Sequence, residues 1–244
     1  MRIKNFLGEI FIFLTSLAIR IPDLGWDIFN PDSWLWKARS YQFSTGFFEL
    51  DFAKSAQVAH PGVTLMWLST LAIKAYSFFN KLFRTSLPSG RQEIFELHFA
   101  QKLVLVIVTS LLLTLAFFLL RGLVGFWAAL FSVLILSLEP FFLAYTRVYH
   151  LDALLTLFVF VAVLCLLNFL ARKLNWRWLA ASAAFSALAM LTKSTALFLF
   201  PFSLLIISMI VLRQPSHKLR FFLLNTCYFL LVTAAAFVVA WPAM

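Results

Sequence analysis

Long apolar runs separated by short polar breaks dominate the chain. The first run covers residues 6–21, and six more follow at about 99–120, 123–146, 153–171, 179–192, 196–212 and 221–241. A helix needs about 20 apolar residues to cross the roughly 30 Å hydrocarbon core of a bilayer. The pattern therefore predicts an all-α polytopic membrane protein with about seven transmembrane helices.

The segment between the first two runs follows a different pattern. Residues 22–98 mix polar and apolar side chains and hold seven of the ten acidic residues. Within this segment, Val63–Phe83 is apolar enough to cross a membrane, but its polar residues recur at helical spacings of four, three and four, namely Thr70, Lys74, Ser77 and Lys81. A single polar stripe on an apolar helix is typical of a helix that lies in the membrane interface. We therefore predict one large loop that carries interfacial helices.

Basic residues predict the orientation of the chain in the membrane. Two short loops are basic, with Arg172, Lys173 and Arg177 in one and Arg213, Lys218 and Arg220 in the other. The positive-inside rule places such loops in the cytoplasm. A polar break at Lys193 divides the stretch between them into two short crossings and an outer turn. Counting back from there puts Asp152 outside, and it puts the whole loop 22–98 outside if Val63–Phe83 does not cross.

Composition agrees with a membrane protein and narrows its partners. The chain is 63% hydrophobic and 12% charged, with a mean hydropathy of +0.93, which excludes a water-soluble globular domain. The net charge of +10 is spread over the loops, so we attribute it to membrane topology and expect membrane lipids, but no nucleic acid, as partners. Both cysteines, Cys165 and Cys227, lie inside apolar runs and form no metal-ligand spacing.

The first candidate for chemistry is the polar segment Arg147-Val-Tyr-His-Leu-Asp152 between two apolar runs. A charge at the bilayer centre costs about 3 kcal/mol on insertion scales, so both charged ends must lie at a membrane surface. A cation and a carboxylate there can hold an anionic, lipid-linked substrate. The alternative is structural: Asp152 caps the next helix, and Arg147 extends to the lipid headgroups. Glu139, at the outer end of the preceding run, is a candidate partner for Arg147.

Three more residues on the predicted outer side extend this pattern. Asp32 follows a proline and precedes a helix-compatible aromatic stretch, so it is either a helix cap or a second carboxylate on the face of Asp152. His60 precedes a proline, either in an ordinary turn or in a loop of the site. Lys193 either reaches the headgroups or flanks a phosphate together with Arg147.

The order of these motifs resembles a known family. An external Pro-Asp, a His-Pro, an Arg-x4-Asp and a Leu-Thr-Lys-Ser follow one another along the chain. This order is similar to that of GT-C type membrane glycosyltransferases, specifically the protein O-mannosyltransferase and aminoarabinose-transferase group, and it covers nearly the whole chain. The resemblance implies one GT-C-like module over residues 1–244 in a bacterial plasma membrane. It also implies transfer of a sugar from a polyprenyl-phosphate carrier to an acceptor, which is a protein hydroxyl, a lipid or a glycan, at the outer face.

The resemblance also implies a role for each site residue. Asp32 matches the first-loop acid that acts at the acceptor, as a general base or through a metal, and Asp152 matches the second external acid. Arg147, Lys193 and His60 match residues that would bind the donor phosphate. The resemblance does not imply a definite cofactor. Ser33 and Ala59 stand where the family has carboxylates, so a divalent metal held by Asp32 and Asp152 stays open. Family members are longer, so we expect this chain to be the N-terminal half of such an enzyme.

A transporter or flippase for a lipid-linked or anionic substrate is the main alternative. Transporters place charges near the membrane midplane and often contain inverted repeats. Here the acids lie at the ends of the apolar runs, and the two halves show no repeat. A non-enzymatic scaffold is a third interpretation, which would not require Asp32 and Asp152 to share one face.

Overall fold

The computed structural model describes residues 2–26, 31–56, 61–83, 89–172, 174–212, 218–241 and 243, and these residues contain helices and no strand. The helices of the bundle are α1 (Arg2–Ala18), α4 (Arg91–Val124), α5 (Phe126–Leu138), α6 (Pro140–Arg147), α7 (Asp152–Ala171), α8 (Trp176–Thr192), α9 (Leu199–Leu212) and α10 (Lys218–Ala240). The other elements are α2 (Pro31–Phe48), α3 (Val63–Phe83) and the short 3₁₀ helices η1 (Phe52–Ser55) and η2 (Ser194–Phe198). The all-α prediction is confirmed.

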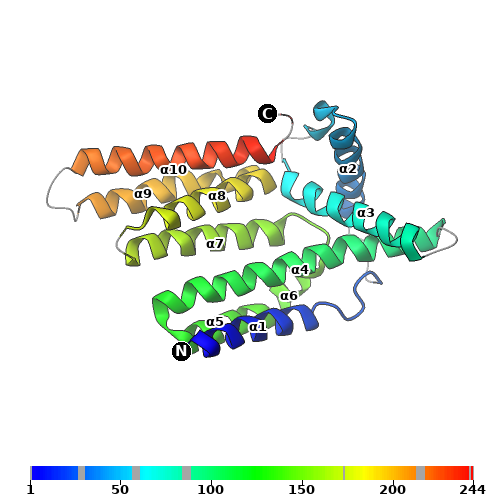
Figure 1. The fold of residues 1–244 in the computed structure, drawn as a ribbon, viewed down its shortest axis with the longest axis horizontal. Coiled ribbons are helices and arrows are strands. Elements are labelled where there is room, and N and C mark those ends of the chain that lie inside the picture. The colour runs from blue at the N-terminus through cyan, green and yellow to red at the C-terminus, as the bar shows by residue number, and fades with distance from the viewer. Residues whose placement is uncertain are drawn as a thin grey trace.

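The bundle helices lie side by side, and two helices of the first loop are stacked on one end of them (Figure 1). Helix α7 packs between α4 and α8, while α1 packs on α4 and α10 packs on α8. Helix α2 lies across the end of the bundle, and α3 runs obliquely along the outer part of α4 (Figure 1). The first loop therefore forms a helical layer over the end at which α7 begins.

The opposite end of the bundle carries the chain's N-terminus and the α4–α5 and α7–α8 connections (Figure 1). Arg121, in the last turn of α4, forms an ion pair with Glu9 of α1 at 2.8 Å. Arg172 and Arg177 flank the α7–α8 connection at the same end. The described basic connections thus share one end, as the charge pattern predicts, and the assignment of that end to the cytoplasm stays a prediction.

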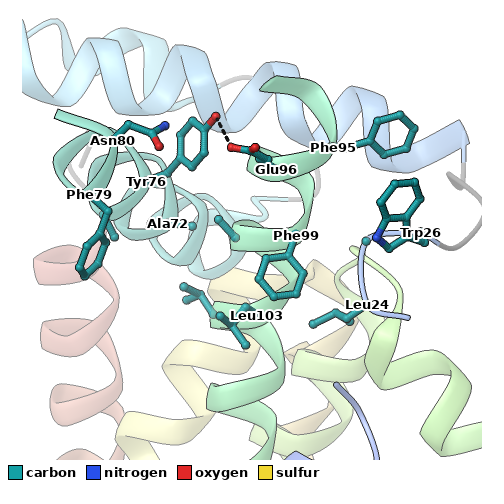
Figure 2. Close-up of a pocket in the computed structure, with 14 residues that line it drawn as sticks. Leu24, Trp26, Ala72, Tyr76, Phe79, Asn80, Phe95, Glu96, Phe99 and Leu103 are labelled. Carbon is teal, nitrogen blue, oxygen red and sulfur yellow. Dashed lines mark hydrogen bonds between the residues drawn. The ribbon is translucent and has the colours of Figure 1, made fainter. Parts of the chain in front are cut away.

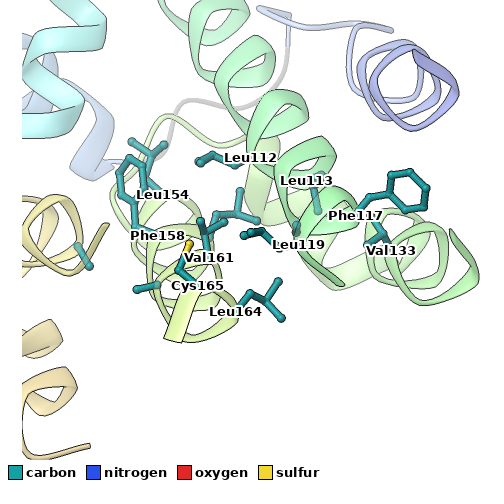
Figure 3. Close-up of a cluster of buried hydrophobic side chains, with 14 of the residues drawn as sticks. Leu112, Leu113, Phe117, Leu119, Val133, Leu154, Phe158, Val161, Leu164 and Cys165 are labelled. Atoms are coloured by element: carbon teal, nitrogen blue, oxygen red, sulfur yellow. The ribbon is translucent and has the colours of Figure 1, made fainter. Parts of the chain in front are cut away.

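The central core lies between α4, α5 and α7. Figure 3 shows Leu113, Phe117 and Val161 in this cluster, and each is fully buried. Helix α7 is apolar all round instead of along one stripe, which is the pattern of a helix surrounded by neighbours. This packing fixes the position of the start of α7, where Asp152 lies, along the axis of the bundle.

The number of membrane-spanning helices is not confirmed at seven. Among the described residues, α4, α7 and α10 are long and apolar enough to cross a bilayer by themselves. Helices α5 and α6 make a fourth span only if they are counted together, because the pair is bent by 65°. The bend falls at Pro140, which cannot donate a backbone hydrogen bond and therefore starts a new helix. Segments 6–18 and 194–209 are apolar but shorter than a full span.

Helix α3 covers the stretch that is ambiguous in the sequence. It is a single helix, and it is not one of the helices that are long and apolar enough to cross a bilayer. Its polar stripe is partly covered by protein, because Thr70 is buried and the Lys74 ammonium lies 3.9 Å from the centroid of the Phe48 ring in α2. The interfacial position of α3 stays a prediction.

Candidate functional site

Four polar side chains from separate parts of the chain meet at the end of the bundle beneath α2. Asp32 Oδ2 lies 3.6 Å from His150 Nε2, and His150 Nδ1 lies 3.2 Å from Asp152 Oδ2. The Lys193 ammonium donates to the other oxygen of Asp152, Oδ1, at 2.9 Å. We call these four residues the acid cluster. Two of the predicted site acids are therefore brought together with one predicted cation, around a histidine that was not predicted.

Helix ends position three of these side chains. Asp32 lies in the first turn of α2, and Asp152 is the first residue of α7, where the partial positive charge of the helix N-terminus favours a carboxylate. Asp152 is not a side-chain cap, because the N-cap residue is Leu151 and both Asp152 oxygens face His150 and Lys193. Lys193 follows α8 with an extended backbone, which turns its side chain back toward α7.

Tyr149 connects α2 to the segment between α6 and α7. Ser33 donates to the Tyr149 carbonyl at 3.2 Å, and the hydroxyls of Tyr149 and Ser40 lie 3.0 Å apart. Tyr149 is 1% exposed, and burial raises the pKa of its phenol to about 12, so it stays protonated at physiological pH. These bonds start from the first and the third turn of α2 and hold Asp32 over His150.

The Lys193 side of the cluster is anchored to α3. The Gly62 amide donates to the Thr192 carbonyl at 3.2 Å, and the hydroxyls of Thr64 and Thr192 lie 2.7 Å apart. Gly62 has a φ of +60°, and a Cβ at this position would lie 2.1 Å from the Trp36 ring. Both the backbone conformation and the close approach of α2 require glycine here. The residue before Lys193 is thus fixed by a loop segment more than a hundred positions away.

Arg147, predicted to bind the donor phosphate, forms no hydrogen bond or ion pair with the acid cluster among the described residues. Its Nη2 donates to the Pro22 carbonyl, while its Nε is buried and has no hydrogen-bond partner among the described residues. Glu139 does not pair with it in the described part of the chain. The Glu139 carboxylate instead accepts from the backbone amides of Phe141 and Phe142 and caps α6. His60 lies outside the described residues.

Arg20 is a cation with a structural role. Its side chain is completely buried and donates to the Thr146 hydroxyl at 2.8 Å, to the Ser16 carbonyl and hydroxyl at 3.0 Å each, and to the Ser137 hydroxyl at 3.0 Å. These bonds tie the end of α1 to α5 and α6. Since Thr146 precedes Arg147, the same bonds fix the place where Arg147 leaves α6.

His150 is the site residue that sequence reasoning missed. It stands two positions before Asp152, inside the segment whose charged ends attracted attention. A histidine between two apolar runs has no periodic or spacing signal that separates it from an ordinary loop residue. Its role depends on Asp32, and only the docking of α2 brings Asp32 to its Nε2.

The acid cluster does not have the form of a metal site. Asp32 and Asp152 face opposite nitrogens of one imidazole ring, so they do not converge on a common point. Lys193 already occupies the other oxygen of Asp152. No three side chains of the metal-binding types converge anywhere in the described ranges. The arrangement of Asp32 and Asp152 in this structure therefore does not fit a bound metal ion.

A separate cavity of about 490 Å³ lies between α3, the outer part of α4 and residues 24–26. Figure 2 shows the aromatic rings of its wall, Trp26, Phe79, Phe95 and Phe99. Its carboxylate, Glu96, accepts from the Tyr76 hydroxyl at 3.3 Å and from Gln92 Nε2 at 2.9 Å. No residue of the acid cluster lines this cavity. Its apolar wall suits a hydrocarbon chain better than a sugar or a phosphate.

Comparison with known proteins identifies the family. The model of the dolichyl-phosphate-mannose-protein mannosyltransferase family matches residues 93–242, more than half of the chain. The match includes Arg147, His150, Asp152 and Lys193, whereas Asp32 precedes it. No curated protein and no solved structure matches the chain. The chain belongs to the dolichyl-phosphate-mannose-protein mannosyltransferase family and is a membrane glycosyltransferase of the GT-C type.

Proposed function

We propose that the protein transfers a sugar from a polyprenyl-phosphate carrier to an acceptor hydroxyl, with the acid cluster as its catalytic site. The observation that carries this proposal is the meeting of Asp32 and Asp152 around His150 at one end of the bundle. Helix caps alone do not require two acids from distant parts of the sequence to share one histidine. Two carboxylates with different neighbours can take different roles in one reaction.

Asp32 is the general base in this mechanism. Its side chain is 59% exposed, so an acceptor hydroxyl can reach it, whereas Asp152 is half as exposed and is already paired with Lys193. Asp32 takes the acceptor proton as the acceptor oxygen bonds to the anomeric carbon. The bond from that carbon to the phosphate oxygen breaks, and its electron pair leaves with the polyprenyl phosphate. General-base catalysis of this kind contributes about 10²–10⁴-fold to the rate.

Arg147 and Lys193 neutralise the negative charge that grows on the leaving phosphate. Arg147 has a buried Nε with no partner among the described residues, and one quarter of the Lys193 side chain is exposed. Asp152 holds the Lys193 ammonium in place until the donor arrives. His60 belongs to this proposal as a third donor-phosphate residue.

The hydrocarbon chain of the donor lies along α3 in this mechanism. The N-terminal end of α3 contacts Thr192, next to Lys193, while Ala72, Ala75 and Tyr76 further along the same helix line the cavity. From Thr64 to Tyr76 the helix rises by roughly 18 Å at about 1.5 Å per residue. One prenyl chain can therefore extend from a donor phosphate at Lys193 to the apolar cavity.

We also propose that the acid cluster faces the outside, on the periplasmic side of a bacterial inner membrane, within an external loop that covers residues 22–98. The described basic connections lie at the opposite end of the bundle (Figure 1). The position of the acids at one end of the bundle, away from its middle, favours the enzyme over the transporter.

The Asp32→Asn variant tests this function directly. Asparagine keeps the shape and the capping ability of aspartate but cannot accept the proton, so we expect normal expression and thermal unfolding with transfer reduced at least 100-fold. The assay uses membranes that contain the whole chain and radiolabelled polyprenyl-phosphate sugars, and it measures the polyprenyl phosphate released.

Asp51→Asn is the matched control, because Asp51 is an exposed acid of the same loop that pairs only with Lys54, at 3.4 Å, among the described residues. We expect it to retain transfer. Full transfer in Asp32→Asn would remove the catalytic assignment and favour the transporter.

A further inference from the structure

Arg172 follows α7 at the end of the bundle opposite to the acid cluster (Figure 1), and its guanidinium has a defined position. Its Cζ lies 4.8 Å from the centroid of the Trp178 ring in α8, which is in the range of a cation–π contact. The same group also reaches α4, because a Cβ added at Gly122 would overlap Arg172 Nη2. The exposed side chain of Arg172 is therefore positioned by two neighbouring helices, and glycine at position 122 leaves room for it.

Among the described residues, the Arg172 guanidinium has no carboxylate partner and forms no side-chain hydrogen bond. Arg121, the neighbour of Gly122, differs in this respect, because it forms an ion pair with Glu9 at 2.8 Å. A guanidinium presents parallel N–H groups that can bind a phosphate through two hydrogen bonds. Since the Arg172 side chain is already positioned, it loses little conformational freedom when an anion binds to it.

Exposed apolar side chains lie at the same end of the bundle. Val124 and Trp127 flank the α4–α5 connection, and Trp176 begins α8. Tryptophan side chains at the ends of membrane-spanning helices lie at the level of the lipid headgroups. Arg172 therefore lies at a depth at which it meets the phosphate groups of lipids, and the exposed apolar side chains can contact the acyl chains of the same molecules.

We propose that Arg172 binds the phosphodiester headgroup of an anionic phospholipid, and that Trp178 and Gly122 position its guanidinium for this purpose. The positive-inside rule requires only that basic residues lie at one end of the bundle, in any geometry. A lipid site requires in addition a guanidinium in one defined place, and Arg172 meets this requirement. An anionic headgroup is favoured over a zwitterionic one, because the ammonium group of the latter is repelled by Arg172. This inference does not depend on the proposed sugar transfer.

The experiment places the purified full chain in phosphatidylcholine nanodiscs that contain increasing fractions of phosphatidylglycerol. A ligand that binds the folded protein raises its melting temperature. The quantity measured is the mole fraction of phosphatidylglycerol that gives half of the maximal rise. We expect Arg172→Gln to increase this fraction about tenfold, which is the loss typical of one charge-assisted hydrogen bond. Arg172→Lys should recover only part of the response, because lysine lacks the planar fork.

Two matched variants separate a positioned guanidinium from charge alone. Gly122→Ala keeps every charge, and alanine is the better helix former, but the added Cβ displaces Arg172 Nη2. We expect Gly122→Ala to weaken lipid binding as Arg172→Gln does. Arg177→Gln removes an equal charge from the same α7–α8 connection, but Arg177 contacts no aromatic ring in the described ranges. We expect Arg177→Gln to keep the wild-type response.

Equal responses of Arg172→Gln and Arg177→Gln would overturn the inference, because charge alone would then explain binding. A wild-type response in Gly122→Ala would also overturn it, since the position of the guanidinium would not matter. Inorganic phosphate added to pure phosphatidylcholine nanodiscs should not raise the melting temperature. A rise equal to that with phosphatidylglycerol would overturn the assignment to a lipid in favour of a free anion. Melting in pure phosphatidylcholine shows that each variant is folded, and the exposed substitution Arg172→Gln decides the question if Gly122→Ala is not.

Discussion

At the residue scale, the site depends on which charges are already paired. Lys193 is bonded to Asp152, whereas Arg147 has one buried nitrogen without a partner in the described part of the chain. A buried unpaired donor costs about 1–3 kcal/mol, so an anion that reaches it gains more from Arg147 than from an exposed cation. Arg147 is therefore the residue where the donor-phosphate proposal can be tested most directly.

We predict that Arg147→Ala weakens binding of a polyprenyl-phosphate sugar about tenfold to 100-fold, because a charge-assisted hydrogen bond contributes about 1.5–3 kcal/mol. Arg147→Lys should recover only part of the affinity, since lysine lacks the planar fork. The measurement is equilibrium binding of labelled donor to detergent-solubilised protein. Arg177→Ala, an exposed arginine at the opposite end of the bundle, is the control. If Arg147→Ala binds the donor as tightly as the wild type does, Arg147 does not bind the donor phosphate and has only a structural role, through its bond to the Pro22 carbonyl.

At the element scale, α3 connects the acid cluster with the apolar cavity. Its first turns bond to the end of α8, its middle contacts α2 and α4, and its second half forms one wall of the cavity. The contact with α8 is made by Thr64 in the first turn of α3, whereas Ala75 in the cavity wall lies about three turns further along the helix. A change in the cavity wall can therefore be made without displacing Lys193.

We predict that Ala75→Phe, which fills the cavity from α3, raises the KM for a long-chain donor about tenfold and leaves turnover of a short-chain donor unchanged. About two buried CH₂ groups account for a tenfold effect, at about 0.8 kcal/mol each. Ala128→Phe on the exposed side of α5 is the control for added bulk. An equal change for both donors, or no change for either, would argue against the cavity as the site of the prenyl chain.

At the scale of the whole molecule, the ends of the bundle differ in kind. One end has the acid cluster beneath a helical layer, and the other has the described basic connections and the Glu9–Arg121 ion pair. A chain whose two ends differ in this way has a preferred orientation in a membrane. The orientation decides from which side donor and acceptor must approach.

We predict that single cysteines at Ala56 and Ser89 react with an impermeant thiol reagent in intact cells, and that one at Ala171 does not. All three positions are exposed in the structure, so burial within the protein does not account for a missing reaction. The background variant lacks Cys165 and Cys227. Reaction at Ala56 without reaction at Ser89 would mean that α3 crosses the membrane.

The sequence by itself determined the fold class, because bilayer-length apolar runs require helices and because charges must lie at their ends. It also indicated candidates for chemistry: Asp32, Arg147, Asp152 and Lys193 were selected by their positions at predicted membrane surfaces, and their roles stay predictions. The sequence did not predict that the apolar run 123–146 is divided into two helices by a bend at Pro140, or that Glu139 caps the second of them. Both features depend on local backbone geometry.

Only the tertiary structure decided how these residues are paired. Lys193 contacts Asp152, a partner that the sequence pattern did not indicate; that Lys193 and Arg147 flank a phosphate stays a prediction. His150 became a site residue because Tyr149 docks α2 and so brings Asp32 to the imidazole. The physical reason is that apolar periodicity and charge predict how deep in the membrane a residue lies. Which other residues it contacts at that depth depends on how the side chains of neighbouring helices pack together.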